Sequence, residues 1–148
     1  MEIIRTDNKN NDFRRLVAEL DKGLAKTDGE EHAFYHQYNG INQLEHCLVI
    51  RKENQAIACG AIKAFDSNSM EVKRMYVDPS IRGQGIGTTL LLALEKWAKE
   101  MNYAKCVLET GKRQPDAVAL YKKNGYSVVD NYGQYKGIEN SICFSKTL

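Results

Sequence analysis

A glycine-rich segment with an arginine, Arg82-Gly83-Gln84-Gly85-Ile86-Gly87, carries the most specific chemistry in the sequence. Glycine costs backbone entropy but lacks a Cβ atom, so three glycines within five residues let the backbone approach a ligand closely. An amphipathic helix pattern begins in the same segment, and the first N–H groups and the dipole of a helix attract anions. We therefore predict a cradle for a pyrophosphate, formed by Arg82, Gly83, Gln84, Gly85, Ile86, Gly87 and Thr88.

Two other glycine-rich phosphate motifs fit this segment less well. A Walker loop ends in Gly-Lys-Ser/Thr, whereas Gly87 is followed directly by Thr88. A dinucleotide fingerprint reads G-x-G-x-x-G; Gly83 and Gly85 match it, but position 88 is threonine. A tight turn before a helix, without any ligand, is the remaining alternative.

The cradle belongs to a chain of short alternating elements. Four helices are expected. The first is capped by Asp7 or Asn8 and has an apolar face formed by Phe13, Leu16, Val17, Leu20 and Leu24. A less regular helix is expected over 30–39, a long one from Gly85 or Ile86 to about Met101, and one over 115–123. Strands are expected over 2–6, 46–51, 56–63, 70–77, 105–110, 126–129 and 140–146. An antiparallel meander followed by a parallel crossover predicts a mixed α/β sheet with helices on both faces.

Two stretches resemble the signatures of one family. Arg82-x-x-Gly85-x-Gly87, after a strand that ends Val-Asp-Pro, resembles the coenzyme A loop of the GNAT (general N-acetyltransferase) superfamily. The run 119–126, Ala-Leu-Tyr-Lys-Lys-Asn-Gly-Tyr, resembles its second signature, and Trp97-Ala98 and Leu108-Glu109-Thr110 extend the resemblance over almost the whole chain. It implies the GNAT acyl-CoA N-acyltransferase fold, a mostly antiparallel sheet of about seven strands flanked by about four helices.

The resemblance also implies acetyl-coenzyme A (acetyl-CoA) as co-substrate, no metal, and direct attack of an amine on the thioester. Backbone N–H groups of Met75, Tyr76 and Val77 would hold the thioester and pantetheine, because in this fold the strand splays from its neighbour there. The family often has Asn seven residues before the signature tyrosine, and this chain has Gln114 instead. We expect Gln114 beside the pantetheine, with one of its hydrogen bonds in question.

The attacking nitrogen must be neutral, although a lysine-like amine has a pKa of about 10.4. Glu71 is the candidate base, acting directly or through water. It lies six residues before Val77, where several relatives of this fold place a catalytic glutamate. The alternative is an ordinary strand carboxylate paired with Lys63 or Lys73, and Glu109 is the second candidate base.

The leaving thiolate needs a proton or a strong hydrogen bond, and Tyr121 of the second signature is the candidate acid. A phenol with a pKa of about 10 would protonate a thiolate with a pKa of about 8.5 uphill, by ~2 kcal/mol in water. A hydrogen bond to the thiolate is therefore the more accessible contribution. The alternative is a helix aromatic packed in the core.

Aromatic and polar residues in two further regions are candidates for the acceptor pocket, with surface placement as the alternative. They are His32, Tyr35, His36 and Tyr38 in the second helix, and Tyr132, Gly133, Tyr135 and Asn140 before the last strand. His32 and His36 have a spacing that chelates zinc, but no HExxH motif or cysteine pair completes the set, so no metal is expected.

Length and composition narrow the class of protein. A chain of 148 residues fits a single domain, 1–148, with a sizeable core. A net charge of +2, with basic and acidic residues interleaved, argues against a nucleic-acid partner. Four scattered cysteines in apolar contexts indicate core residues in a reducing compartment. No signal pattern or membrane-spanning run is present, so we expect a cytoplasmic monomer or homodimer without a membrane partner.

Three functions are compatible with these patterns. The first is an N-acetyltransferase for a primary amine of a small or amino-acid-like molecule. The second is an acetyltransferase for a protein lysine, an N-terminus or an aminoacyl-tRNA. The third is a non-catalytic acetyl-CoA sensor, against which the presence of both Glu71 and Tyr121 argues. The acceptor and the length of the acyl group stay open.

Overall fold

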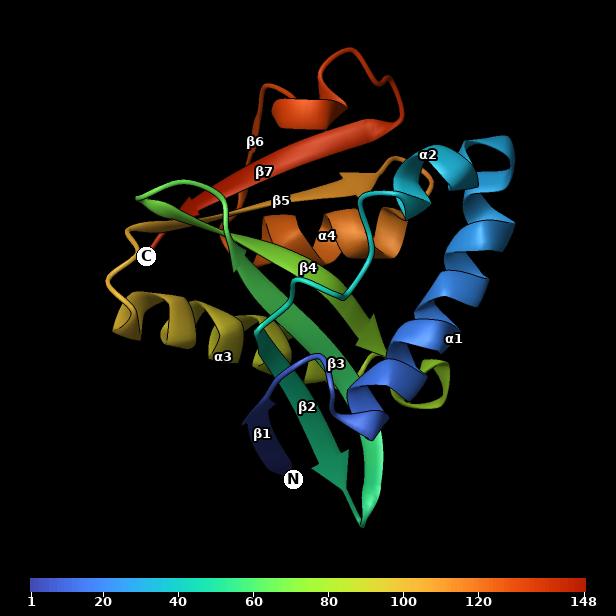
Figure 1. Ribbon diagram of the computed structural model, residues 1–148, viewed down its shortest axis with the longest axis vertical. Helices are drawn as coiled ribbons and strands as arrows, with labels where there is room; N and C mark the ends of the chain where they lie inside the picture. The colour runs from blue at the N-terminus through green and yellow to red at the C-terminus, as the bar shows by residue number, and fades with distance from the viewer. The chain divides into compact units, whose positions relative to one another are not determined.

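The computed structural model describes residues 1–148 as seven strands and four α-helices (Figure 1). The strands are β1 (Glu2–Thr6), β2 (His46–Lys52), β3 (Gln55–Ala64), β4 (Ser69–Val77), β5 (Lys105–Gly111), β6 (Ser127–Val129) and β7 (Ser141–Thr147). The helices are α1 (Asn11–Asp28), α2 (His32–His36), α3 (Ile86–Glu100) and α4 (Pro115–Lys123). Three short 3-10 helices are η1 (Gly29–Glu31), η2 (Pro79–Ile81) and η3 (Gly133–Tyr135).

The strands form one sheet in the order β1-β2-β3-β4-β5-β7-β6. β4 and β5 run parallel, and the pairs β1–β2, β2–β3, β5–β7 and β6–β7 run antiparallel. This topology confirms the predicted α/β class and the mostly antiparallel sheet. None of the helices combines the length and the apolar character that crossing a bilayer requires.

The chain divides into two compact units. The first contains residues 1–63 and 72–94, and the second contains residues 64–71 and 95–148. β4 and α3 each contribute residues to both units. The single domain expected from the chain length stays a prediction.

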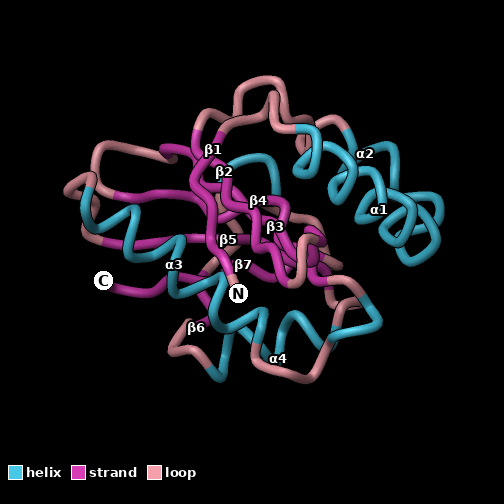
Figure 2. The backbone as a smooth tube through the Cα atoms, turned by 90° about the horizontal axis from the view of Figure 1, so that it is seen from below, coloured by secondary structure: helices cyan, strands magenta, loops and turns pink.

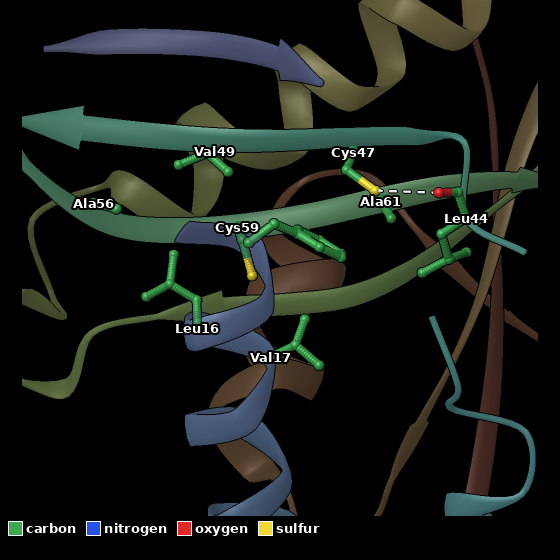
Figure 3. Close-up of a cluster of buried hydrophobic side chains, with 9 residues drawn as sticks. Leu16, Val17, Leu44, Cys47, Val49, Ala56, Cys59 and Ala61 are labelled. Carbon is green, nitrogen blue, oxygen red and sulfur yellow. Dashed lines mark hydrogen bonds between the residues drawn. The ribbon is translucent and has the colours of Figure 1, made fainter. Parts of the chain in front are cut away.

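In the first unit, α1 packs on one face of β2 and β3 (Figure 3). Side chains alternate between the two faces of a strand, so Cys47 and Val49 of β2 share a face with their partners Ala61 and Cys59 of β3. Apolar residues spaced i, i+3 and i+4 on α1 cover this face. Of the five residues predicted for this face, Phe13, Leu16 and Val17 are each at most 6% exposed, and Leu20 and Leu24 are half-buried.

On the opposite face of this unit, Gly60 of β3 lets α3 approach the sheet. Figure 2 shows α1 and α2 on one side of β2 and β3 and α3 on the other. A Cβ atom on Gly60 would lie 2.9 Å from Leu94 Cδ1 and 3.2 Å from Met75 Sδ, closer than packed side chains tolerate. The missing side chain therefore allows Leu90 and Leu94 to pack fully buried, which fixes the start of α3.

In the second unit, β5, β7 and β6 form an antiparallel sheet, with the first residues of β4 parallel to β5 (Figure 1). Glu71 of β4 lies opposite Val107 of β5, and Glu109 of β5 lies opposite Cys143 of β7. Paired residues, and residues two apart on one strand, share a face. The backbone register therefore places both glutamates on the same face of this unit.

The N-terminal region differs from its prediction. α1 is capped by Asn10, whose side chain accepts a hydrogen bond from the Phe13 N–H at 2.9 Å, so the predicted cap at Asp7 or Asn8 is wrong. Asn8 instead donates to the Ile41 carbonyl at 2.9 Å and holds the segment before β2. The second helix is shorter than the predicted 30–39, because a 3-10 turn, η1, precedes α2.

All four cysteines are free, buried core residues, as predicted from their apolar contexts. Burial raises the pKa of the thiols of Cys47, Cys59 and Cys106 to about 12, and that of Cys143 to about 11. At neutral pH these thiols are protonated and behave as small apolar side chains.

Candidate active site

The predicted cradle begins where β4 ends, and Asp78 organises the turn. Its N–H donates to the Ile57 carbonyl at 2.8 Å, which ties the turn to β3. Its carboxylate caps η2 by accepting from the Ser80 N–H at 2.9 Å and from the Ser80 hydroxyl at 2.8 Å. These hydrogen bonds, led by that from the backbone, lower the pKa of Asp78. The loop therefore leaves the strand in one defined direction.

Gly83 and Gly85 adopt a backbone conformation that other residues rarely take. Their φ angles are +81° and +79°, in the left-handed region that favours glycine. An ideal Cβ atom on either residue meets no protein atom within 4 Å, so the space beside the loop is open. Backbone conformation explains why these two positions are glycine in the free protein, and the open space leaves room for the predicted close approach of a ligand.

The N-terminus of α3 offers an uncompensated positive end. The Gly85 carbonyl accepts from the Thr89 N–H at 3.0 Å and from the Thr89 hydroxyl at 3.1 Å, so the helix starts directly after the loop. The first N–H groups of a helix have no partner inside it. α1 and α4 carry Asp12 and Asp116 in their first turns, whereas α3 carries no acidic residue there. This end suits an anion.

The remaining residues of the predicted cradle lie beside the two glycines in the sequence. Arg82 is exposed; its Nε donates to the Val77 carbonyl at 2.9 Å, and its guanidinium carbon lies 5.8 Å from the centre of the Tyr76 ring. Ile86 is buried and anchors the first helical turn, while Gly87 and Thr88 are half-buried. The exposed cation, the open glycine backbone and the helix dipole fit a pyrophosphate.

Met75 and Tyr76, which precede the loop, face opposite sides of β4. The sulfur of Met75 lies beside Gly60 on the α3 side, whereas Tyr76 packs against the core that α1 covers. Burial, and after it the charge of Asp78, raises the pKa of Tyr76. Both side chains are thus held in the fold, which leaves the backbone as the predicted contact with a ligand.

In the second unit, Glu71 is a buried carboxylate with a tyrosine partner. Glu71 is 8% exposed as a whole residue, and its Oε2 accepts a hydrogen bond from the Tyr132 hydroxyl at 2.7 Å. The Tyr132 ring packs against Phe65 at 4.7 Å and Tyr135 at 5.8 Å between centroids. Burial, followed by the charge of Glu71, raises the pKa of Tyr132, so its hydroxyl is a donor at neutral pH.

Asn131 holds the loop that carries these tyrosines. Its Nδ2 donates to the carbonyls of Tyr135, Ile138 and Ser141 at 3.0–3.1 Å. Sequence analysis named Tyr132 and Tyr135 as acceptor-pocket candidates but missed Asn131 and Phe65. An asparagine in a loop is an ordinary turn signal, and nothing local indicates that its amide reaches three carbonyls.

Tyr121 lies in α4 and is 6% exposed. Its ring contacts Tyr126 and Phe144, with 5.9 Å between centroids in each case. Burial, and after it the charge of Glu109, raises the pKa of its hydroxyl. The hydroxyl is therefore a poorer proton donor than a free phenol but stays protonated and able to donate a hydrogen bond at neutral pH.

The predicted site residues fall into two groups, one in each unit. The cradle, Met75 to Val77 and the candidates His32 to Tyr38 belong to the first unit. Glu71, Glu109, Tyr121, Gln114 and the loop from Asn131 to Asn140 belong to the second unit. Within the second unit the structure brings Glu71 and Tyr132 together.

Other candidate residues make contacts that do not involve Glu71 or Tyr132. Gln114 occupies the cap position of α4 without a capping side-chain hydrogen bond, and its N–H donates to the Gly111 carbonyl at 3.0 Å. Lys63, a suggested partner of Glu71, donates to Gln43 Oε1 at 3.0 Å. The rings of His32 and His36 stack at 5.3 Å, and no group of three or more His, Cys, Asp or Glu side chains suits a metal ion.

Comparison with known proteins identifies the family. The model of the acetyltransferase (GNAT) family matches residues 12–126. The IAA acetyltransferase of Azospirillum brasilense is 38% identical over 103 residues, which cover 68% of this chain and 67% of that protein. The uncharacterized N-acetyltransferase YjgM of Escherichia coli is 32% identical over 126 residues, or 80% of this chain and 74% of that protein.

A solved structure extends the likeness over the full length. The crystal structure of a protein described as an acyl-CoA N-acyltransferase, from Klebsiella pneumoniae, superposes with a TM-score of 0.83 at 32% identity. The superposition covers 99% of this chain and 97% of that one. The likeness includes β1, which precedes the family match, and β6 and β7, which follow it.

Proposed function

Because the chain belongs to the acetyltransferase (GNAT) family and is an acetyl-CoA-dependent N-acetyltransferase, we propose that it acetylates a primary amine of a small or amino-acid-like molecule by direct attack. The buried Glu71 carboxylate, oriented by the Tyr132 hydroxyl at 2.7 Å, carries this proposal. A carboxylate in a fixed position can accept the proton that a protonated amine must lose before it attacks.

The cradle in the first unit binds the pyrophosphate of acetyl-CoA. The N–H groups at the start of α3 and the exposed Arg82 supply the donors and positive charge, and Gly83 and Gly85 leave the backbone uncovered. Backbone N–H groups of Met75 to Val77 hold the thioester carbonyl and stabilise the oxyanion that develops there.

Glu71 takes the amine proton, directly or through water. The neutral amine nitrogen then forms a bond to the acyl carbon, and the carbon–sulfur bond breaks with its electrons on sulfur. The nitrogen, positively charged after the attack, loses its second proton to solvent and becomes the amide nitrogen. Tyr121 donates a hydrogen bond to the departing thiolate. Its raised pKa favours this contribution over complete proton transfer, so the final proton of the thiol comes from solvent.

A screen of primary amines for release of coenzyme A thiol tests this function. Small amines and amino acids form one set, peptides with free lysine or N-terminal amines form a second, and a tertiary amine is the control. We expect release with members of the first set, matched by the N-acetylated product in mass spectrometry.

The other outcomes point to the other functions. Release with peptides alone would replace the small acceptor by a protein. Tight binding of acetyl-CoA without release for any amine would indicate a sensor and contradict the proposal. Glu71→Gln, with cofactor affinity retained, is the matched control for non-enzymatic acetylation.

A further inference from the structure

Arg74 has a backbone conformation that its place in the fold does not explain. Four non-glycine residues have positive φ angles: Glu53, Asn54, Arg74 and Asn102. Glu53 and Asn54 form the tight turn between β2 and β3, and Asn102 follows the end of α3, where such angles are ordinary. Arg74, with φ +58°, lies inside strand β4.

The Arg74 side chain is buried and tied to α1. It is 2% exposed, and its Nη2 donates to Asp21 Oδ1 at 2.5 Å and to the Val17 carbonyl at 3.5 Å. Its Nε is buried without a hydrogen-bond partner. The Arg74 carbonyl accepts from the Cys59 thiol at 3.6 Å, so β3 also contacts this residue.

Stability alone would favour another residue at this position. Glycine adopts a positive φ without strain, whereas an arginine does so at a cost. Burial of the Arg74 guanidinium also costs desolvation, and an apolar residue in place of a buried charge with its partner often stabilises a fold as well or better. Strained backbone that is held by surrounding contacts is a feature of sites that must keep one geometry.

We propose that Arg74 and Asp21 are positioning residues for the acyl group. The pair holds the left-handed residue in β4, which turns the peptide planes that follow and fixes the direction of the N–H groups of Met75 to Val77. This inference rests on the proposed function, because these N–H groups matter for catalysis only if the thioester carbonyl lies along β4.

Arg74→Gly and Arg74→Ala separate backbone geometry from packing. Both variants remove the whole guanidinium and differ by one methyl group, but only glycine takes φ +58° without strain. The readout is the ratio of the dissociation constants of coenzyme A and acetyl-CoA, measured by calorimetry, which isolates the acyl group. We expect the ratio to be about 5- to 30-fold lower in Arg74→Ala than in Arg74→Gly, the effect of a left-handed penalty of about 1–2 kcal/mol.

Asp21→Asn tests the pair without changing Arg74. We expect it to lower the ratio in the wild-type background and to have no effect in Arg74→Gly, where no guanidinium is present. Asp12→Asn is the matched control: Asp12 also lies on α1, pairs with Arg51 and has a side chain 35% exposed, against 32% for Asp21. It should leave the ratio unchanged.

Equal ratios in Arg74→Ala and Arg74→Gly, or a ratio of one in the wild type, would overturn the proposal. If Arg74→Ala fails to fold, Asp21→Asn decides: a ratio equal to that of Asp12→Asn would overturn the proposal. Because the readout is binding, it is independent of turnover. Failure of the proposed function, seen as absence of an acetylated amine, is thereby distinguished from failure of this inference.

Discussion

Removal of the Tyr132 hydroxyl is the sharpest perturbation of the Glu71 site. Tyr132→Phe keeps the ring, which packs against Phe65 and Tyr135, and removes only the donor 2.7 Å from Glu71 Oε2. A hydrogen bond to a charged group contributes about 1.5–3 kcal/mol. Glu71 is 8% exposed, so water replaces the lost donor poorly. We therefore expect the free energy of unfolding at pH 7 to fall by about 1.5–3 kcal/mol.

Urea titrations of the wild type, Tyr132→Phe, Glu71→Gln and the double variant measure the coupling between the two side chains. Glu71→Gln retains an oxygen acceptor, so it should lose less stability than Tyr132→Phe. The kcat/KM of Tyr132→Phe should also fall at pH 7, with coenzyme A affinity unchanged, because the carboxylate is no longer oriented. A Tyr132→Phe variant as stable as the wild type would refute the hydrogen bond as an energetic contact. Strong coupling with unchanged kcat/KM would make the pair purely structural.

Three further predictions concern the cradle, the acid and the core. Acetyl-CoA should raise the Tm of the wild type and of the control variant Gly23→Ala. It should not raise the Tm of Gly85→Val, because valine strains the backbone at φ +79° and fills the space beside the loop. A Tm shift in Gly85→Val equal to that of the wild type would exclude the cradle. Tyr121→Phe should bind coenzyme A normally while kcat falls about tenfold or more, and wild-type turnover would leave Tyr121 a packing residue. The thiols of Cys47, Cys59 and Cys106 have a pKa of about 12 in the folded protein. In the unfolded chain the same thiols have a pKa of about 8.5, so the unfolded chain loses these protons at lower pH than the folded protein does. The contribution of these thiols to the free energy of unfolding should therefore be constant below about pH 8, and the free energy should fall as pH rises from there toward 12, less steeply in Cys47→Ala; a flat profile above pH 8 would contradict the burial.

Local signals made much of the fold predictable. α4 was predicted over 115–123 and spans Pro115–Lys123, because a proline in the first turn and Asn124-Gly125 after the last turn mark both ends. β5 was predicted over 105–110 and extends one residue further, to Gly111. The apolar face of α1 was predicted from its spacing alone. The N-terminal cap of α1 was not predicted correctly, because Asp, Asn and Asn at positions 7, 8 and 10 are all good caps. Only the structure shows that the Asn8 side chain is used in a hydrogen bond to the Ile41 carbonyl.

The features that depend on distant residues were not predictable. Glu71 and Tyr132 are 61 residues apart, and the Arg74–Asp21 contact spans 53 residues. Neither pair has a local sequence pattern, since both arise from how the strands and helices of one unit pack. The left-handed backbone at Arg74 could not be predicted from the residue type either, because the residue that favours such a conformation is glycine. The sequence thus predicted a cradle and a candidate base, which stay predictions, but not the contacts that hold these residues in place.

The most direct test of the account is the pH dependence of the Glu71→Gln defect. With an acceptor amine found in the screen, kcat/KM of the variant and of the wild type is compared from pH 7 to pH 10, at saturating acetyl-CoA. We expect a defect of about 100-fold or more at pH 7 that shrinks as pH approaches the pKa of the acceptor, because the amine then arrives neutral and needs no base. A defect of constant size from pH 7 to pH 10 would contradict the base role of Glu71.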